Sequence, residues 1–127
     1  MTENEIGKII VDCAYHIHTD LGPGLLESVY ETVLVHELRE RGLRVRSQVG
    51  IPIVYKGITF EEGFRADLIV EDKVIIEIKS VEKKHEVYYK QLLTYLKLSG
   101  IKLGCLINFG EKYIKTGIER VVNQLPE

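Results

Sequence analysis

The sequence has almost no net charge and no long hydrophobic run. Lys and Arg number 17 against 19 Asp and Glu, so the formal net charge is −2 at pH 7. This balance excludes binding to nucleic acid through a basic coat alone, and any such contact needs a local patch or a metal ion. No apolar stretch approaches the roughly 20 residues that a membrane helix requires, so no association with a membrane is expected.

The chain is also poor in cysteine, with only Cys13 and Cys105. Both lie within apolar patterns and lack metal-ligand spacing, so we expect reduced core residues in a cytoplasmic protein. The polar, acidic first five residues do not resemble a secretory signal, and repeats and low-complexity tracts are absent. The chain has 127 residues, of which 45% are hydrophobic and 28% charged. This length and composition predict one globular domain over residues 1–127.

Helical periodicity marks the N-terminal part of the chain and one later segment. An apolar stripe at helical spacing predicts a helix over residues 3–19. Gly22-Pro23-Gly24 breaks this helix, and a second is expected over residues 25–41. A third helix is expected over residues 86–99.

Alternation of apolar and polar residues predicts strands elsewhere. The first three strands are expected over residues 45–55, 60–70 and 74–78, and an almost wholly apolar, central fourth over residues 103–109. Residues 113–122 fit either a strand or a short helix, and a strand that turns helical is favoured. The order helix, helix, three strands, helix, strand predicts an α/β fold with a mixed sheet flanked by helices.

Three charged residues, Asp67, Glu77 and Lys79, interrupt the second and third strands. Charges within a strand cost desolvation energy unless something pairs with them. A three-residue loop over residues 71–73 would place Asp67 directly opposite Glu77, with Cβ atoms about 5 Å apart. A two-residue loop would send Glu77 to the other face.

The apolar pattern favours the three-residue loop. With that loop, one face of the two strands collects the apolar residues Ala66, Leu68, Val70, Val74, Ile76 and Ile78. The other face carries the charged residues Arg65, Asp67, Glu77 and Lys79.

Two carboxylates so close together repel each other, and a hard divalent cation relieves that repulsion. Oxygen ligands suit Mg²⁺ or Mn²⁺, and the carbonyl of Ile78 is a natural third ligand. A lysine beside such a cation can orient and polarise water for in-line attack on a phosphodiester. The alternative is a purely structural salt bridge of Lys79 with either carboxylate.

These residues resemble the core of the PD-(D/E)xK nuclease superfamily. Asp67 lies on one strand and Glu77-Ile78-Lys79 on the next, with Ala66 in place of the proline. Gln91 and Tyr95 form a Gln-x-x-x-Tyr element that is similar to that of the RecB-like and lambda-exonuclease-like branch.

Two further segments resemble a narrower group. Gly24-Leu25-Leu26-Glu27-Ser28-Val29-Tyr30 matches the pattern that names the GxxExxY protein family. Leu106-Ile107-Asn108-Phe109-Gly110 is similar to that family's last core strand. The resemblance extends over about residues 5–122.

The resemblance implies a restriction-endonuclease-like fold and a role for each matching residue. Asp67 and Glu77 would ligate Mg²⁺ or Mn²⁺, and Glu27 would bind the cation through water or hold a second one. Lys79 would activate the water and stabilise developing charge. Gln91 and Tyr95 would orient the lysine, the water or a phosphate oxygen. The structural alternatives are a helix-dipole partner for Glu27 and the polar edge of a packed helix for Gln91 and Tyr95.

The expected function is that of an enzyme, a Mg²⁺-dependent nuclease that hydrolyses phosphodiester bonds of nucleic acid by metal-activated water. DNA is the favoured substrate. The alternative is a catalytically silent module of the same fold that binds nucleic acid or a protein partner, and the small size and net charge of −2 favour it. A bare catalytic core has little surface for gripping a duplex, so a homodimer or a protein partner is also expected.

Overall fold

The computed structural model describes residues 1–126. In chain order, the elements are α1 (Glu3–Leu21), α2 (Glu27–Glu40), β1 (Val45–Tyr55), β2 (Ile58–Val70), β3 (Val74–Lys79), α3 (Glu86–Ser99), β4 (Leu103–Asn108), α4 (Ile114–Gly117) and β5 (Ile118–Val122). The expected order is confirmed through β4, and each boundary falls within two residues of its expected position. The expected order of the last segment is wrong, because the helical turn α4 precedes the strand β5.

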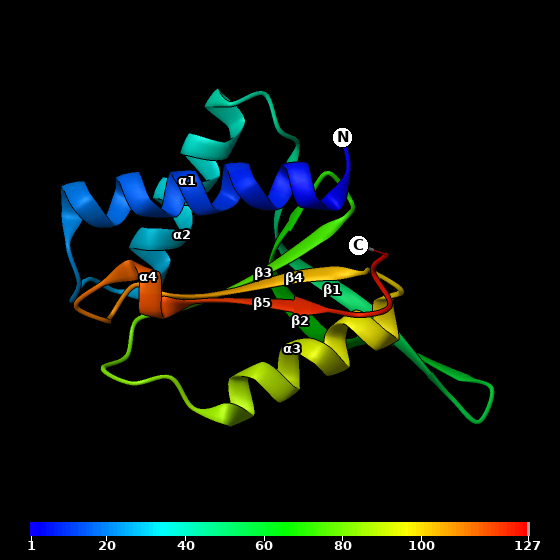
Figure 1. Cartoon of the computed structure of the whole chain (residues 1–127). Coiled ribbons are helices and arrows are strands. Elements are labelled where there is room, and N and C mark those ends of the chain that lie inside the picture. Colours follow the sequence, from blue (N-terminus) through cyan, green and yellow to red (C-terminus); the bar gives the residue numbers. More distant parts are fainter. Residues whose placement is uncertain (127) are drawn as a thin grey trace.

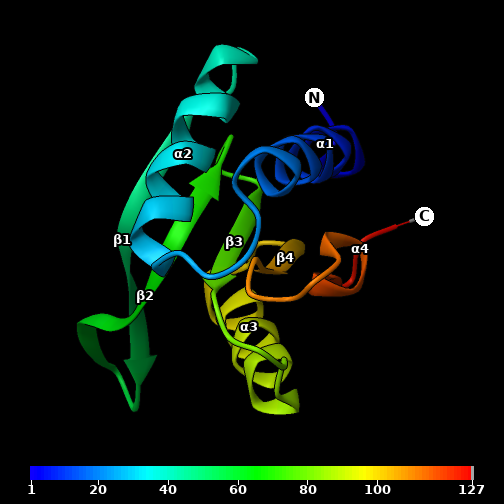
Figure 2. The same cartoon turned by 90° about the vertical axis from the view of Figure 1, so that its left-hand side faces the viewer.

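The strands form one sheet in the order β1-β2-β3-β4-β5. Strands β3 and β4 are parallel, with α3 as the crossover between them, and the other neighbouring strands are antiparallel. Helices α1 and α2 lie on one side of the sheet and α3 on the other (Figure 1). Figure 2 shows α2 alongside β1 and β2. The expected mixed sheet with flanking helices is therefore confirmed.

Each face of the sheet has its own hydrophobic core. The core beneath α1 and α2 includes Ile6, Ile10, Leu34, Leu38, Leu68, Val74, Ile76 and Ile78. The core beneath α3 includes Ala66, Ile69, Ile75, Leu92, Leu96, Leu106 and Val121. Each fully buried aliphatic side chain of this kind contributes roughly 1.5–3 kcal/mol, so both layers stabilise the sheet. A sheet covered on both sides explains why β3 and β4 are almost wholly apolar.

The alternation of side chains inverts part-way along β1 and β2. Leu68 packs beneath α1 and α2, but Ala66 packs beneath α3. Residues two apart share a face in a regular strand, so the prediction that Ala66 shares a face with Leu68 is wrong. On β1, Gln48 lies at the same level, across from Asp67, and has a left-handed φ of 51°. This irregular residue is where the two strands exchange their faces.

A three-residue turn connects β2 to β3, as the apolar pattern predicts. Val70 pairs with Val74, so residues 71–73 form the loop. Glu71 and Asp72 both adopt left-handed φ values, 53° and 54°. This conformation costs a residue other than glycine about 1–2 kcal/mol. The turn therefore requires stabilising contacts from outside.

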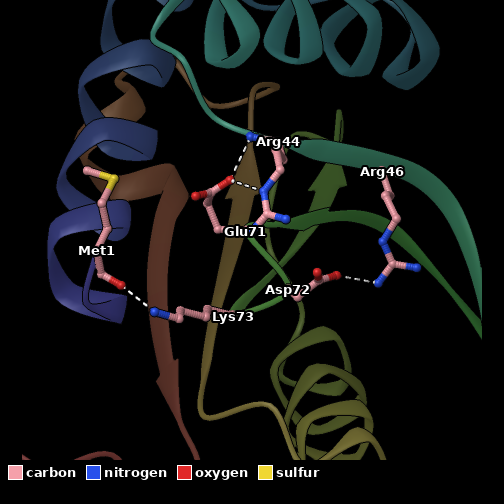
Figure 3. Close-up of polar contacts among 6 residues, drawn as sticks. All are labelled: Met1, Arg44, Arg46, Glu71, Asp72 and Lys73. Atoms are coloured by element: carbon pink, nitrogen blue, oxygen red, sulfur yellow. Dashed lines mark hydrogen bonds and ion pairs between the residues drawn. The ribbon is translucent and has the colours of Figure 1, made fainter.

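Strand β1 and the residue before it supply those contacts (Figure 3). One carboxylate oxygen of Glu71 accepts hydrogen bonds from the backbone N–H and the Nε–H of Arg44, at 2.8 and 3.1 Å. The Glu71 N–H donates in return to the Arg44 carbonyl at 2.9 Å. Arg46 pairs with Asp72 at 2.7 Å. These contacts hold the register that brings Asp67 opposite Glu77.

Both cysteines, Cys13 and Cys105, are free and buried, which confirms them as core residues. None of the helices within residues 1–126 combines the length and the apolar content needed to cross a bilayer.

Candidate functional site

The backbone pairing of β2 with β3 ends just before the two acidic residues predicted to face each other. The last paired residues are Leu68 and Ile76, and the same register places Asp67 across from Glu77. Side chains continue the hydrogen bonding there. The Ile78 N–H donates to Asp67 Oδ2 at 2.8 Å, and the Asp67 N–H donates to Glu77 Oε1 at 3.4 Å. The predicted register is confirmed, and the two carboxyl groups lie at one point of the sheet.

Glu77 is one of the few charged residues in the interior, with 9% of its surface exposed. Burial and the neighbouring charge of Asp67 raise the pKa of Glu77 to about 9. The nearby Lys79 charge lowers this pKa, but by less than burial and Asp67 raise it. At neutral pH the Glu77 carboxyl group therefore holds a proton unless a further positive charge joins it.

A pocket of about 300 Å³ lies between α2 and the sheet beside this pair. Its lining consists of Glu27, Ser28, Glu31, Gln48, Asp67, Ile78 and Lys79. Glu27 and Glu31 are four residues apart and so share a face of α2. Of the predicted cation ligands, Glu27, Asp67 and Ile78 meet in this pocket, whereas Glu77 is connected to it through Asp67.

Repulsion among the carboxylates is visible at Glu31. Burial raises the pKa of Glu31, and the charges of Asp67 and Glu27 raise it further. A hydrogen bond from Gln48 acts in the opposite direction, since its Nε2 donates to Glu31 Oε1 at 2.8 Å. The pocket is therefore an acidic site in which a cation would relieve unfavourable charge.

Lys79 ends β3 and is the one cationic side chain in the lining of this pocket. Its Nζ lies 4.7 Å from the centre of the Tyr88 ring, on α3. Within residues 1–126 it makes no ion pair with Asp67 or Glu77. The structure therefore lacks the salt bridge that was the alternative role of Lys79. This cation–π contact with Tyr88 holds the ammonium against α3 without neutralising it.

The loop before α2 positions Glu27 at the first residue of that helix. Gly24 has a φ of 104°, which only glycine adopts without strain. The Tyr30 hydroxyl donates to the Gly22 carbonyl at 2.5 Å and accepts from the Leu25 N–H at 3.2 Å. The glycine and tyrosine of the segment 24–30 therefore shape the loop, and the glutamate between them reaches the pocket.

The chain that leaves β3 is held against β4 and this loop. Asn108, fully buried, accepts from the backbone N–H of Val81 and of Gly110, both at 3.0 Å, and donates to the Val81 carbonyl at 2.9 Å. A Cβ at Gly110 would lie 2.3 Å from the Val81 carbonyl oxygen, so only glycine permits this approach. The Ser80 hydroxyl donates to the Leu25 carbonyl at 2.5 Å. These contacts fix the direction of the backbone directly after Lys79.

The two predicted residues on α3 differ in their placement. Tyr95 stacks on Phe64, with ring centres 3.9 Å apart. Burial raises the pKa of Tyr95, and the charges of Glu77 and Asp67 add to the rise, so its hydroxyl lies near the acidic pair. Gln91 is exposed and makes no side-chain hydrogen bond within the described part of the chain. The structure thus brings Tyr95, but not Gln91, toward the site.

The donor set of the pocket fits a hard divalent cation. Among residues 1–126, no three acidic, histidine or cysteine side chains converge into a complete protein cage. Mg²⁺ does not require such a cage, because one or two carboxylates with water commonly complete its coordination. Burial is the main cause of the raised pKa values of Glu31 and Glu77, and the negative charge of Asp67 adds to both. Carboxylates and a backbone carbonyl are oxygen donors of the kind Mg²⁺ and Mn²⁺ bind.

The family model described as the PD-(D/E)XK nuclease superfamily matches residues 4–121. The chain belongs to the PD-(D/E)XK nuclease superfamily. The mixed sheet with flanking helices is the restriction-endonuclease-like core of that superfamily. No curated protein matches the chain.

Glu31 and Gln48 line the pocket of this PD-(D/E)XK protein, and the sequence analysis assigned neither of them to the site. Glu31 carries a usable signal, since it lies one helical turn after Glu27 and shares its face. Gln48, an exposed residue, carries none, because its place at the pocket depends on a left-handed backbone that strand periodicity does not reveal.

Proposed function

We propose that the protein is a Mg²⁺- or Mn²⁺-dependent nuclease that hydrolyses phosphodiester bonds of nucleic acid, with DNA as its substrate. Superfamily membership supports the reaction class. The observation that carries the assignment is the pocket in which Glu27, Asp67 and Lys79, from three different elements, line one cavity. Membership of the GxxExxY family is part of the same proposal and rests on the segment 24–30.

Asp67 and the carbonyl of Ile78 are the cation's ligands in this proposal, with Glu77 joining once it loses its proton. Glu27 holds the cation from the α2 side, through water or with a second ion. A bound divalent cation polarises the phosphate and lowers the pKa of water so that it can attack at neutral pH.

Lys79 stabilises the negative charge that develops on the phosphate in the transition state. Its ammonium has no carboxylate partner within 4.0 Å among the described residues and rests on Tyr88, so it is available to substrate. Removing one such electrostatic contact costs about a hundredfold or more in rate. The hydroxyl of Tyr95, near Glu77, orients the carboxyl group or a phosphate oxygen.

Cleavage of single- and double-stranded DNA and RNA in Mg²⁺ and in Mn²⁺ tests the proposal. We expect cation-dependent cleavage of DNA by the wild type, and loss of about a hundredfold or more in Lys79→Ala and Asp67→Asn. Lys102→Ala is the matched control, because Lys102 is exposed just before β4, at the opposite end of the sheet. Unchanged activity in Lys79→Ala would remove Lys79 from the mechanism.

The second candidate is a catalytically silent module that binds nucleic acid or a protein partner. The net charge of −2 favours it, since a duplex must otherwise be gripped by a nearly neutral surface. Calorimetric titration with Mn²⁺ separates the two. The nuclease binds Mn²⁺ and loses binding in Asp67→Asn, whereas the silent module shows no binding and tolerates the change.

A further inference from the structure

We propose that Gln48 is a positioning residue that holds Asp67 in the orientation needed to bind the cation. This inference rests on the proposed nuclease function and adds a residue to its site. Gln48 acts through Asp67 and does not itself touch the cation or the substrate.

One nitrogen of Gln48 connects two carboxylates of the pocket. Its Nε2 donates to Glu31 Oε1 at 2.8 Å and, more weakly, to Asp67 Oδ1 at 3.4 Å. The other oxygen of Asp67 already accepts from the Ile78 N–H at 2.8 Å. Asp67 is therefore held on both oxygens, from β3 on one side and from β1 on the other.

The backbone of Gln48 is built for this orientation. Its φ of 51° is left-handed, in the middle of a strand, where a residue other than glycine is strained. Such strain persists where the surroundings favour it, and here the Gln48 carbonyl accepts from Arg65 Nη1 at 3.0 Å. The inverted alternation at this level lets Gln48 and Asp67 both line the pocket beside α2.

The carboxamide is chemically suited to a site that must still attract a cation. It donates hydrogen bonds to both carboxylates and so offsets their repulsion, yet it adds no positive charge. A lysine or arginine at this position would neutralise the carboxylates and compete with the cation. A neutral donor keeps Asp67 ordered while the pocket stays negative.

Gln48→Gly separates this role from a purely structural one. Glycine adopts a positive φ without strain, so the variant removes the amide while relieving the backbone. Gln124→Gly is the matched control, because Gln124 also has a left-handed φ, 57°, and is exposed beyond β5. Gln48→Met keeps the side-chain length but has no donor, and it decides the outcome if the glycine variant is unstable.

The measurements are Mn²⁺ affinity by calorimetry, and kcat and KM for DNA at saturating Mn²⁺. For Gln48→Gly and Gln48→Met we expect Mn²⁺ affinity and kcat each to fall about three- to tenfold, the size of one net hydrogen bond, with KM unchanged. Gln124→Gly should match the wild type in all three. If the wild type is active and both Gln48 variants match it, this inference is overturned and the proposed function stands. If the wild type neither binds Mn²⁺ nor cleaves DNA, the proposed function is overturned as well.

Discussion

The Glu77 carboxyl group accepts the backbone N–H of Asp67 at 3.4 Å and lies beside the carboxylate of the same residue. Burial is the main reason that the pKa of Glu77 rises to about 9, and the charge of Asp67 is the second. The folded chain consequently binds a proton that the unfolded chain does not. Proton and divalent cation should compete for the same acidic pair.

The first prediction concerns stability against pH without a divalent cation. Because the pKa of Glu77 rises from 4.5 to about 9 on folding, its protonated form stabilises the fold most below pH 4.5. This contribution is lost as the pH rises toward about 9, with a slope of up to about 1.4 kcal/mol per pH unit. Urea unfolding at about pH 6 and about pH 8, in the presence of a chelator, measures the loss.

Glu77→Gln is the control for this effect. The glutamine cannot titrate, so the decline in stability between about pH 6 and about pH 8 should become much smaller. An equal decline in the wild type and in Glu77→Gln would show that another group is responsible.

The second prediction couples cation binding to stability. A ligand present at about 100 times its Kd stabilises the folded state by about 2.7 kcal/mol. Mg²⁺ or Mn²⁺ should therefore raise the melting temperature of the wild type, and Asp67→Asn should abolish the rise. Without a cation, Asp67→Asn should be at least as stable as the wild type, since it removes the charge that raises the pKa values of Glu31 and Glu77. A variant that still gains the full stabilisation would place the cation elsewhere.

The third prediction concerns Tyr30, the tyrosine of the segment 24–30. Its hydroxyl joins the Gly22 carbonyl and the Leu25 N–H, and its ring stacks on Phe109 with centres 4.4 Å apart. Tyr30→Phe should lower the free energy of unfolding by about 1 kcal/mol, because it removes the hydrogen bonds that tie the exposed loop to the buried Tyr30 side chain.

Tyr113→Phe serves as the comparison for Tyr30→Phe, since Tyr113 is 63% exposed. Its free energy of unfolding should stay within about 0.5 kcal/mol of the wild type. Equal effects of the two substitutions would contradict a structural role for the Tyr30 hydroxyl.

The fourth prediction concerns the turn between β2 and β3. Asp72 has a left-handed φ of 54°, and its ion pair with Arg46 is exposed at both ends. Such exposed pairs contribute little, so Asp72→Gly should stabilise the protein by up to about 1 kcal/mol. Cleavage should be unchanged, because the register between Asp67 and Glu77 is kept. Thermal unfolding and a cleavage assay check both parts, and a destabilised variant would show that the Asp72 pair matters more than the backbone strain.

Apolar periodicity was sufficient to predict the register that places Asp67 across from Glu77. Aliphatic residues at alternate positions on both strands allow one loop length that keeps the apolar faces together. The same pattern predicted the wrong face of the sheet for Ala66. The alternation inverts at Gln48, and its left-handed backbone conformation cannot be predicted from its residue type. Residues 113–122 were predicted in the wrong order, since a single helical turn is too short to show a period.

The residues of the candidate site also differ in whether the sequence alone could reveal them. Asp67, Glu77 and Lys79 stand out in the sequence, because each is a charge among buried aliphatic residues. Gln48 has no such contrast, and its role emerges only when its backbone geometry and its two carboxylate partners are known. Glu31 could have been found from helical spacing, but its proximity to Asp67 depends on how α2 packs on the sheet.

Anomalous scattering from a crystal soaked in Mn²⁺ would locate the cation itself. We expect an anomalous peak in the pocket between α2 and the sheet, within coordination distance of the Asp67 carboxylate and the Ile78 carbonyl, and no peak there in Asp67→Asn. A wild-type crystal with no peak at Asp67, or with its manganese at a different surface, would contradict this expectation.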